Sequence, residues 1–190
     1  MGIILASSSP RRRELLEMLG VEGFAVIPAD VDETIPELPP EEAVALIALQ
    51  KARKVAESGH KGDLVIAADT LVYLDGEALG KPVTRSEAKR MLRRLSGARH
   101  EVYTGVALCA DGRETAFTER TDVFFREMLD DEIEAYIKTG EPMDKAGAYG
   151  AQGKGAVFIR RIEGDFFNVM GLPVCRLITE LRGFGLNHIV

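Results

Sequence analysis

Asp69 is the carboxylate in this sequence with the setting best suited to chemistry. It follows the apolar run Leu64–Ala68, and an uninterrupted run of this kind is typical of a strand buried on both faces. We therefore predict that Asp69 and Thr70 lie at the carboxyl end of a strand, where open α/β sheets bind their ligands. A carboxylate there can hold Mg²⁺ or take a proton from water. The alternative is a turn-forming aspartate, although the strand pattern resumes at Leu71 and no helix follows that needs a cap.

The segment Ser7-Ser8-Ser9-Pro10 has the pattern of an anion-binding turn. It joins the short apolar run Ile3–Ala6 to a helical pattern, and Pro10 suits the first position of that helix. Such a turn directs backbone N–H groups, hydroxyls and the positive end of the helix dipole toward one point. Three arginines follow at once: Arg11, Arg12 and Arg13. Phosphate binding is one interpretation, and ordinary helix capping beside solvated arginines is the other.

Two lysines and one acidic segment offer further charged groups. Lys51 falls inside the apolar stripe of its predicted helix, so its ammonium either reaches solvent on a buried stem or meets an anion. Lys81 lies in the rigid loop Gly80-Lys81-Pro82, for which a surface turn is the alternative. In the acidic segment Asp30–Glu33, carboxylates such as that of Glu33 could share a cation or could be solvated.

Residues 139–155 form a glycine-rich segment, with five glycines among small residues. Glycine allows the backbone to approach a ligand closely. Gln152 carries both a donor and an acceptor, which suit the hydrogen-bonding edge of a nucleobase. The alternative is a flexible loop, but loops of this length without a function are uncommon in compact domains.

Length and composition predict one domain over residues 1–190 with a well-formed core. The net charge of −6 argues against nucleic-acid binding through bulk positive charge and is compatible with a small phosphorylated ligand. We expect Cys109 and Cys175 to be buried free thiols in a reducing compartment. No apolar run has the length or composition of a membrane span or a secretory leader, so we expect a cytoplasmic protein.

Hydrophobic periodicity predicts an α/β protein in which short strands alternate with amphipathic helices. The predicted strands are Ile3–Ala6, Phe24–Pro28, Leu64–Ala68, Leu71–Leu74, Val102–Ala110, Ala116–Phe125 and Ala156–Ile162. Helices are predicted after Pro10, over 41–58, after the capping box at Thr84, from a cap at Asp130 and after Pro173. Two Asp-Gly pairs, Asp75-Gly76 and Asp111-Gly112, predict hairpins and hence a mixed sheet.

Together these motifs resemble the Maf family of nucleoside triphosphate pyrophosphatases, over nearly the full length of the chain. The resemblance rests on several motifs in order: Leu5–Arg12, Ala67–Thr70, Gly80–Pro82, Ser96-Gly97 with His100, Thr104-Gly105 and Asp144–Gly153. One departure is Ser8, which stands where many members have glycine. No Walker-type phosphate loop is present, and no Ser-His-Asp arrangement is indicated by His60, His100 and His188.

The resemblance implies a mixed, elongated sheet flanked by helices, similar to inosine triphosphatase, with two lobes around a cleft. It implies hydrolysis of a nucleoside triphosphate to the monophosphate and pyrophosphate, which cleans the nucleotide pool. Asp69 matches the family's catalytic acid, and Arg11, Thr70 and Gln152 match the branch that acts on dTTP and UTP. Glu33, Lys51 and Lys81 fall on polar positions of the family's cleft.

From these residues we expect the triphosphate to be held by Arg12, Lys51, Lys81 and the turn Ser7–Ser9, with Arg13 solvated. Glu33 and Asp69 are the predicted ligands of Mg²⁺ or Mn²⁺. Whether Asp69 takes the proton itself or orders a metal-bound water is left open. Two other functions are possible interpretations of the same residues. One is a pyrophosphatase for a different nucleotide, such as 7-methyl-GTP, and the other is a non-catalytic nucleotide-binding regulator of cell division. A homodimer is expected only from the commonness of two-fold assemblies.

Overall fold

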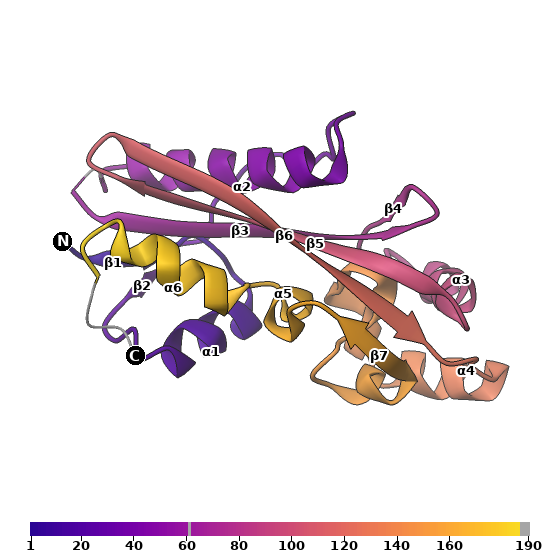
Figure 1. Ribbon diagram of the computed structural model, residues 1–190. Helices are drawn as coiled ribbons and strands as arrows, with labels where there is room; N and C mark the ends of the chain where they lie inside the picture. The colour runs from indigo at the N-terminus through magenta and orange to yellow at the C-terminus, as the bar shows by residue number, and fades with distance from the viewer. Residues whose placement is uncertain (61, 187–190) are drawn as a thin grey trace. The chain divides into compact units, whose positions relative to one another are not determined.

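The computed structural model describes residues 1–60 and 62–186, which form a mixed sheet flanked by helices (Figure 1). Seven strands are present in these residues: β1 (Ile3–Leu5), β2 (Ala25–Val26), β3 (Leu64–Leu74), β4 (Glu77–Leu79), β5 (Arg99–Ala110), β6 (Arg113–Phe125) and β7 (Ile159–Glu163). The α-helices in them are α1 (Pro10–Met18), α2 (Pro40–Glu57), α3 (Arg85–Leu95), α4 (Asp130–Lys138), α5 (Phe166–Met170) and α6 (Val174–Arg182). Three short 3₁₀ segments follow α4: Glu141–Asp144, Ala146–Ala148 and Lys154–Phe158.

The sheet has the strand order β2-β1-β3-β5-β6-β7, with β4 paired to β3. Strand β1 is parallel to both β2 and β3, and Ile4 is the register partner of Ala25 on one side and Val65 on the other. Strands β3 and β4 are antiparallel, as are β6 and β7. The mixed sheet predicted from the sequence is therefore confirmed.

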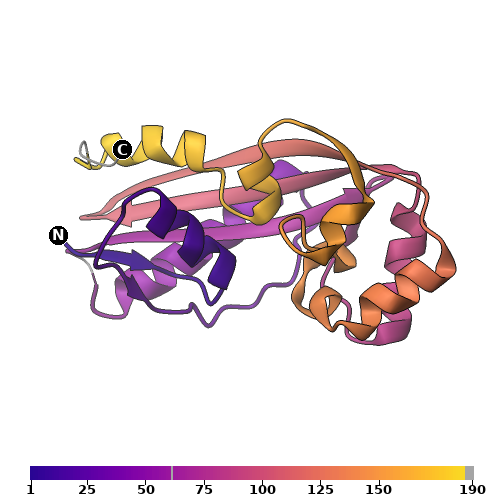
Figure 2. The ribbon, with the colours of Figure 1, turned by 90° about the horizontal axis from the view of Figure 1, so that it is seen from below.

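The chain divides into two compact units. The first unit comprises residues 1–69, 104–119 and 171–190, and the second comprises residues 70–103 and 120–170. In the first unit, α2 covers one face of the sheet and α1 and α6 cover the other (Figures 1 and 2). Its core contains many alanines, since Ala6, Ala48, Ala52, Ala67 and Ala107 pack together with Ile4, Val55 and Val65.

Small residues allow α2 to lie unusually close to the sheet in the first unit. A Cβ atom added to Gly105 on β5 would lie 2.3 Å from the backbone carbonyl of Val44 on α2. Any larger residue would push the helix away, because backbone atoms cannot yield as the end of a side chain can. The Thr104-Gly105 motif therefore sets the depth of α2, and with it the position of Lys51 two turns later.

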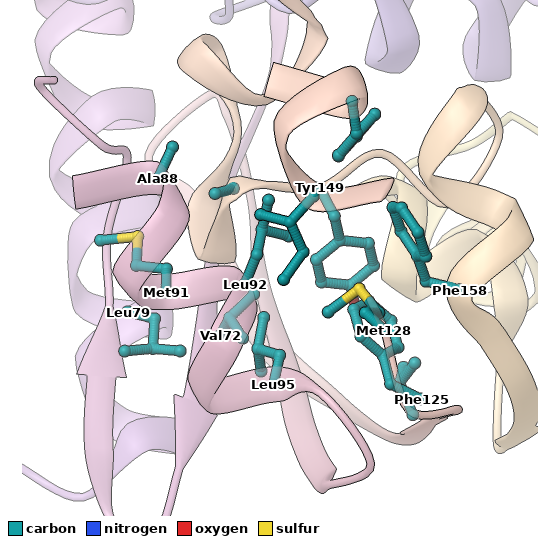
Figure 3. Packing of buried hydrophobic residues seen from close by; sticks show 14 of the residues in the cluster. Val72, Leu79, Ala88, Met91, Leu92, Leu95, Phe125, Met128, Tyr149 and Phe158 are labelled. Carbon is teal, nitrogen blue, oxygen red and sulfur yellow. The ribbon is translucent and has the colours of Figure 1, made fainter. Parts of the chain in front are cut away.

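The apolar core of the second unit is built around aromatic residues and the inner face of α3 (Figure 3). Helices α3 and α4 lie against each other, and Leu92, Leu95 and Ile133 are fully buried between the elements. The rings of Phe125, Tyr149 and Phe158 extend this core toward the glycine-rich segment. That segment is thus anchored on a rigid core.

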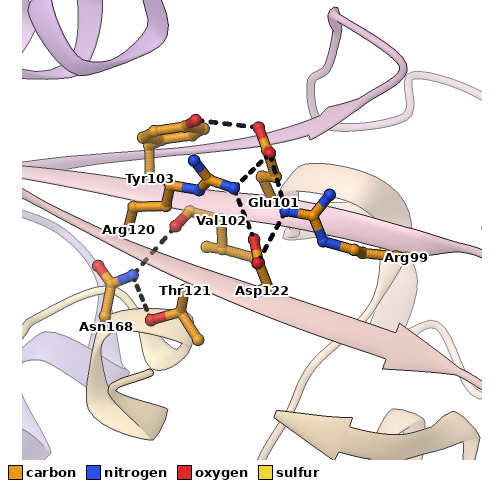
Figure 4. A network of polar contacts seen from close by, with 8 residues as sticks. All are labelled: Arg99, Glu101, Val102, Tyr103, Arg120, Thr121, Asp122 and Asn168. Carbon is orange, nitrogen blue, oxygen red and sulfur yellow. Dashed lines mark hydrogen bonds and ion pairs between the residues drawn. The ribbon is translucent and has the colours of Figure 1, made fainter. Parts of the chain in front are cut away.

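Polar side chains secure α5 to the sheet within the second unit (Figure 4). Buried Asn168 donates hydrogen bonds from Nδ2 to the carbonyl of Val102 and to Oγ1 of Thr121, each at 3.0 Å. The same network contains alternating charges on β5 and β6: Arg99, Glu101, Arg120 and Asp122. Burial raises the pKa of Asp122, but the hydrogen bonds from Arg99 and Arg120 outweigh burial and leave the pKa below its usual value.

Both predicted hairpin turns are confirmed by their backbone geometry. Asp75 and Gly76 have φ of 54° and 80°, and Asp111 and Gly112 have φ of 49° and 77°. Two consecutive positive φ values are typical of the turn that joins two antiparallel strands with their natural twist. The first pair connects β3 to β4, and the second connects β5 to β6.

Three predictions about elements were wrong. The runs Leu64–Ala68 and Leu71–Leu74 form one continuous strand, so Asp69 and Thr70 lie in the middle of β3 and not at a carboxyl end. Asp130 is the first residue of α4, whose N-cap is Leu129. Residues 156–158 belong to a 3₁₀ segment before β7, and helix α5 was not predicted.

The cysteine prediction holds in part. Both thiols are free, and Cys109 is buried, but Cys175 lies exposed on α6. Within the residues that the structure describes, no helix combines the length and apolar character needed to cross a membrane.

Candidate active site

Asp69 belongs to a charge cluster in the first unit that is centred on Lys51. Its Oδ1 atom accepts a hydrogen bond from Nζ of Lys51 at 2.7 Å, and the same ammonium lies 2.6 Å from Oε1 of Glu33. Asp69 and Lys51 are only 8 % and 5 % exposed, whereas the Glu33 side chain is half exposed. One lysine therefore holds two carboxylates at the boundary between the core and solvent.

The sequence of α2 explains why Lys51 is buried. Ile47, Ala48, Ala52 and Val55 form the apolar face that packs on the sheet, and Lys51 lies in the same stripe. Its ammonium does not reach bulk solvent, because two carboxylates satisfy it inside the unit. Of the two outcomes expected for this lysine, the structure therefore shows the one in which it meets an anion.

The turn before α1 has the capping geometry expected for Ser9 and Pro10. Ser9 is the N-cap and its Oγ accepts from the backbone N–H of Arg12 at 3.5 Å, while Pro10 is the first helical residue. The N–H of Ser9 donates to Oγ of Ser7 at 3.2 Å. One of the amides predicted to face a phosphate is therefore used within the turn itself.

Arg12 is fixed by two contacts in the first unit. Its Nε donates to the carbonyl of Gly171 at 2.8 Å, and its Nη1 donates to Oγ of Ser7 at 3.1 Å. Two such bonds define the plane of a guanidinium group. Burial lowers the pKa of Arg12, while the charges of Asp69 and Glu33 act in the opposite direction. Arg12 is thus a preorganised cation beside the charge cluster.

The three consecutive arginines differ in their surroundings. Arg13 is exposed and pairs with Glu17 one turn later on the helix at 2.8 Å, which agrees with its predicted place on the helix surface. Arg11 and Arg12 are both partly buried. The run of basic residues is therefore not one patch, because consecutive residues on a helix point in different directions.

Glu33 and Asp69, the predicted metal ligands, converge on a single ammonium group. Within residues 1–60 and 62–186, no group of three or more His, Cys, Asp or Glu side chains is arranged to hold a metal ion. Two carboxylates are nevertheless a donor set that suits Mg²⁺, which commonly takes one or two protein carboxylates and completes its shell with water and phosphate oxygens.

The remaining candidate residues lie in the second unit. Thr70 follows Asp69 directly on β3, and Lys81 and Gln152 are both exposed in loops. A backbone hydrogen bond of 3.1 Å from Gly147 to the carbonyl of Gly80 joins the loop of Lys81 to the glycine-rich segment. The two loops are therefore positioned by common contacts.

Neither described histidine lies in the charge cluster. His100 is 1 % exposed, and its Nε2 lies 2.8 Å from the hydroxyl of Tyr149 in an aromatic cluster with Phe125. Burial lowers the pKa of His100 to about 3, so the ring is neutral at physiological pH. His60 lies 3.5 Å from Asp63 on the surface, and His188 falls outside the described residues.

Sequence reasoning missed one structurally important group in each unit. The carbonyl of Gly171, which orients Arg12, comes from a backbone position 159 residues away, and no side-chain pattern marks it. Glu141 was passed over inside the glycine-rich segment, where its carboxylate binds two backbone amides. One signal in the sequence could have marked Glu141. It is an acidic residue in a segment rich in glycine, and glycines allow the backbone to pack closely against another group.

Comparison with known proteins identifies a family and close relatives. The family model described as "Maf-like protein" matches residues 2–184. A protein of Bacillus cytotoxicus named dTTP/UTP pyrophosphatase is 52 % identical over 188 residues, which is 97 % of each chain. A protein of Bacillus anthracis with the same name is 50 % identical over 186 residues, covering 97 % of this chain and 96 % of its own.

Solved structures share the fold at lower sequence identity. A HAM1 protein from Coxiella burnetii matches with a TM-score of 0.56 and 20 % identity, covering 96 % of this chain and 99 % of its own. The Ham1 protein of Staphylococcus aureus matches with a TM-score of 0.54 and 16 % identity, covering 97 % and 100 %. These likenesses agree with the predicted fold class.

Proposed function

This chain belongs to the Maf family, and from that premise we propose that it hydrolyses dTTP and UTP to the nucleoside monophosphate and pyrophosphate. The relatives that carry this activity in their names are half identical to it over nearly the whole chain. The observation that supports the proposal most directly is the buried contact of 2.7 Å between Lys51 and Asp69, with Arg12 fixed nearby.

The chemistry requires a water molecule to attack the α-phosphorus in line with the departing pyrophosphate. We assign Asp69 to position that water and to take up its proton, since its carboxylate is buried and Lys51 binds one of its oxygens, Oδ1. Proton uptake by a correctly placed base contributes roughly a hundredfold or more to the rate of such reactions. Lys51 holds the base and supplies positive charge next to it.

The triphosphate would be bound by cations and by the turn at the start of α1. Arg12 is preorganised by Gly171 and Ser7, so it loses little side-chain freedom when it binds an anion. Lys51 and Lys81 supply further charge, and the hydroxyls and remaining amides of Ser7–Ser9 lie at the positive end of a helix. Charge stabilisation of this kind is the main protein contribution to phosphoryl transfer.

A divalent cation, Mg²⁺ or Mn²⁺, would be held by Glu33 and Asp69. Both carboxylates already converge on one cationic group, the ammonium of Lys51, so the donor set fits a hard metal ion. Such an ion would neutralise the negative charge of the triphosphate oxygens. The residues of the chain then retain their separate tasks of orienting the water and holding the phosphates.

Selection of the base would depend on Arg11, Thr70 and Gln152. Thymine and uracil present two carbonyl groups and an imide N–H, and Gln152 has the matching donor and acceptor. When bound substrate buries such hydrogen bonds, a base that leaves the protein groups unpaired is disfavoured by a large factor in kcat/KM. Removal of unwanted pyrimidine triphosphates from the cytoplasmic nucleotide pool is the cellular role that we propose for this activity.

The test is pyrophosphate release from dTTP and UTP by the purified protein, with Mg²⁺ and with EDTA. We expect turnover with the metal, loss of turnover in EDTA, and a fall of at least roughly a hundredfold in Asp69→Asn. Asp63→Asn is the matched control, because Asp63 directly precedes β3 and its carboxylate binds the backbone of Gly2. Near-normal turnover by Asp69→Asn would remove Asp69 from the chemistry.

A panel of nucleotides tests the substrate. Faster hydrolysis of 7-methyl-GTP than of UTP would contradict the assigned base selection while retaining the reaction. Nucleotide binding without any pyrophosphate release would contradict hydrolysis and would favour a sensing role.

A further inference from the structure

The glycine-rich segment is held from inside by one carboxylate in the second unit. Oε1 of Glu141 accepts from the backbone N–H of Gly155 at 3.1 Å, and Oε2 accepts from the backbone N–H of Lys154 at 2.9 Å. Both amides directly follow the turn that carries Gln152. Hydrogen bonds to an ionised acceptor are about twice as strong as neutral ones, so this end of the turn is firmly fixed.

The other end of the turn is fixed through a tyrosine. The hydroxyl of Tyr136 donates to Oε1 of Glu141 at 2.8 Å and accepts from the backbone N–H of Gly150 at 3.0 Å. Residues on both sides of Gln152 are therefore bound to one Glu141–Tyr136 pair. We call this arrangement, Glu141 and Tyr136 with the amides of Gly150, Lys154 and Gly155, the loop clamp.

Three of the five glycines of the segment, Gly150, Gly153 and Gly155, are explained by close packing at the loop clamp. A Cβ atom at Gly153 would lie 2.5 Å from Oε1 of Glu141, and one at Gly155 would lie 2.7 Å from the hydroxyl of Tyr136. A Cβ atom at Gly150 would lie 2.8 Å from Cε of Lys145. The sequence suggested that these glycines let the backbone approach a ligand, but here they let it approach the protein's own side chains.

The surroundings of Glu141 favour its ionised form, which is the form that can accept these hydrogen bonds. Burial raises the pKa of Glu141, but the amides of Lys154 and Gly155 and the hydroxyl of Tyr136 outweigh it, and the pKa lies below its usual value. Lys145 also donates from Nζ to the backbone carbonyl of Glu141 at 2.9 Å. The carboxylate is therefore charged at neutral pH, as the loop clamp requires.

Gln152, in contrast, is exposed at the tip of the turn. The backbone of Gln152 lies between Gly150 and Lys154, whose amides the loop clamp holds. The direction of the Gln152 side chain therefore depends on hydrogen bonds made by its neighbours. We infer that Glu141 is a positioning residue for base selection, holding Gln152 ready for the nucleobase through the loop clamp. This inference rests on the function proposed above, because it assigns Glu141 a role in the selectivity of that same reaction.

The test compares selectivity with turnover in Glu141→Gln. Glutamine keeps the shape of glutamate, but one of its two terminal groups is an NH₂ donor. This NH₂ group would face a backbone N–H of Lys154 or Gly155, so one of the two hydrogen bonds would be lost. We expect the ratio of kcat/KM for UTP to that for CTP to fall by about tenfold, through KM for UTP, with kcat for saturating UTP within about twofold of wild type. Glu134→Gln, which removes an exposed carboxylate of α4 that pairs with Lys89, is the matched control and should leave the ratio unchanged.

A double variant separates positioning from a general structural effect. If Glu141 acts through Gln152, then Glu141→Gln combined with Gln152→Ala should be no less selective than Gln152→Ala alone. Additive losses would overturn the inference. An unchanged UTP to CTP ratio in Glu141→Gln, or a loss confined to kcat, would overturn it as well.

Failure of the inference and failure of the proposed function give different results. Wild-type protein that releases no pyrophosphate from any nucleotide would overturn both. Active wild type, a changed ratio in Gln152→Ala and an unchanged ratio in Glu141→Gln would overturn the inference alone. If Glu141→Gln does not fold, Tyr136→Phe replaces it, because it removes only the hydroxyl that joins Glu141 to Gly150 and is expected to shift the ratio in the same direction.

Discussion

The charge cluster around Lys51 and the loop clamp around Glu141 use charged side chains in opposite ways. In the cluster, the ammonium of Lys51 is shared by the carboxylates of Glu33 and Asp69. All three side chains are candidates for contact with substrate or metal. In the loop clamp, one carboxylate is occupied by backbone amides and a hydroxyl, and the candidate residue Gln152 makes none of these contacts. Under the proposed function, the first region holds the reacting groups directly, and the second holds Gln152, the proposed base-selecting residue, through the backbone.

This difference indicates how the two tasks of the enzyme are separated. Side-chain ion pairs can exchange partners when a charged substrate or metal arrives, which suits a site that must bind phosphates and move a proton. Bonds to backbone amides cannot exchange in this way without moving the chain, which suits a loop that must present one side chain in one direction. Substitutions should therefore damage turnover in the first region and selectivity or local stability in the second.

The largest effect is expected for Lys51→Met, which keeps a long apolar side chain but removes the ammonium. Asp69 and Glu33 would then face each other without their shared cation, and breaking a buried pair costs about 3–5 kcal/mol. We expect turnover of UTP to fall by at least about a hundredfold and the midpoint of urea unfolding to decrease. Lys54→Met, on the exposed face of the same helix, is the control. Equal activity of the two variants would contradict the role of the cluster.

A smaller loss is expected for Arg12→Lys. Lysine keeps the charge but cannot bind the carbonyl of Gly171 and the hydroxyl of Ser7 with one planar group. We expect kcat/KM for UTP to fall by about a hundredfold, or about 2.7 kcal/mol, measured by steady-state kinetics. Arg13→Lys should change it little, because Arg13 pairs only with exposed Glu17 among the contacts found for it. If neither variant loses activity, charge alone and not geometry is what matters at this helix, and equal losses in both would contradict the special role of Arg12.

His100 provides a test of the second region through pH. Burial lowers its pKa from 6.5 to about 3, so the unfolded chain binds a proton below pH 6.5 that the folded protein does not. The stability from this neutral histidine is complete above pH 6.5 and is lost as pH falls from there toward 3. Between pH 7 and pH 5 we expect the free energy of unfolding to drop by about 2 kcal/mol more in wild type than in His100→Gln.

Urea unfolding at pH 7, 6 and 5 measures this difference. The comparison between the two proteins cancels the contributions of carboxylates that they share. If the free energy of unfolding changed with pH in the same way in wild type and His100→Gln, His100 would take up its proton in the folded protein as in the unfolded chain. That result would contradict a neutral ring buried beside Tyr149.

Much of the fold could be predicted because it depends on local patterns. The apolar stripe of α2, the N-cap at Thr84 and the two Asp-Gly turns are each visible within a few residues, and each is found in the structure. The predicted capping box is only half formed, because the carboxylate of Glu87 accepts from the backbone N–H of Val83 and not from that of Thr84. The prediction failed where two signals conflicted. Asp69 and Thr70 are polar enough to suggest a strand end, but β3 continues through both residues, and the buried carboxylate of Asp69 is satisfied by Lys51.

The candidate site was only partly predictable for a related reason. The sequence marked Lys51 as a buried lysine and Asp69 as a candidate acid, from the pattern around each one separately. That they bind each other follows from the depth of α2 on the sheet, which Gly105 permits. Base selection by Arg11, Thr70 and Gln152 remains a prediction.

The sequence by itself determined the types of elements, the position of the hairpins and the residues able to do chemistry, because these follow from periodicity, turn conformation and functional groups. Only the tertiary structure decided which groups share a partner. The pairing of Lys51 with Asp69 and Glu33, the contact of Arg12 with Gly171 and the loop clamp of Glu141 join residues through strand order and helix packing. Such contacts depend on where whole elements come to lie, and no local stretch of sequence carries that information.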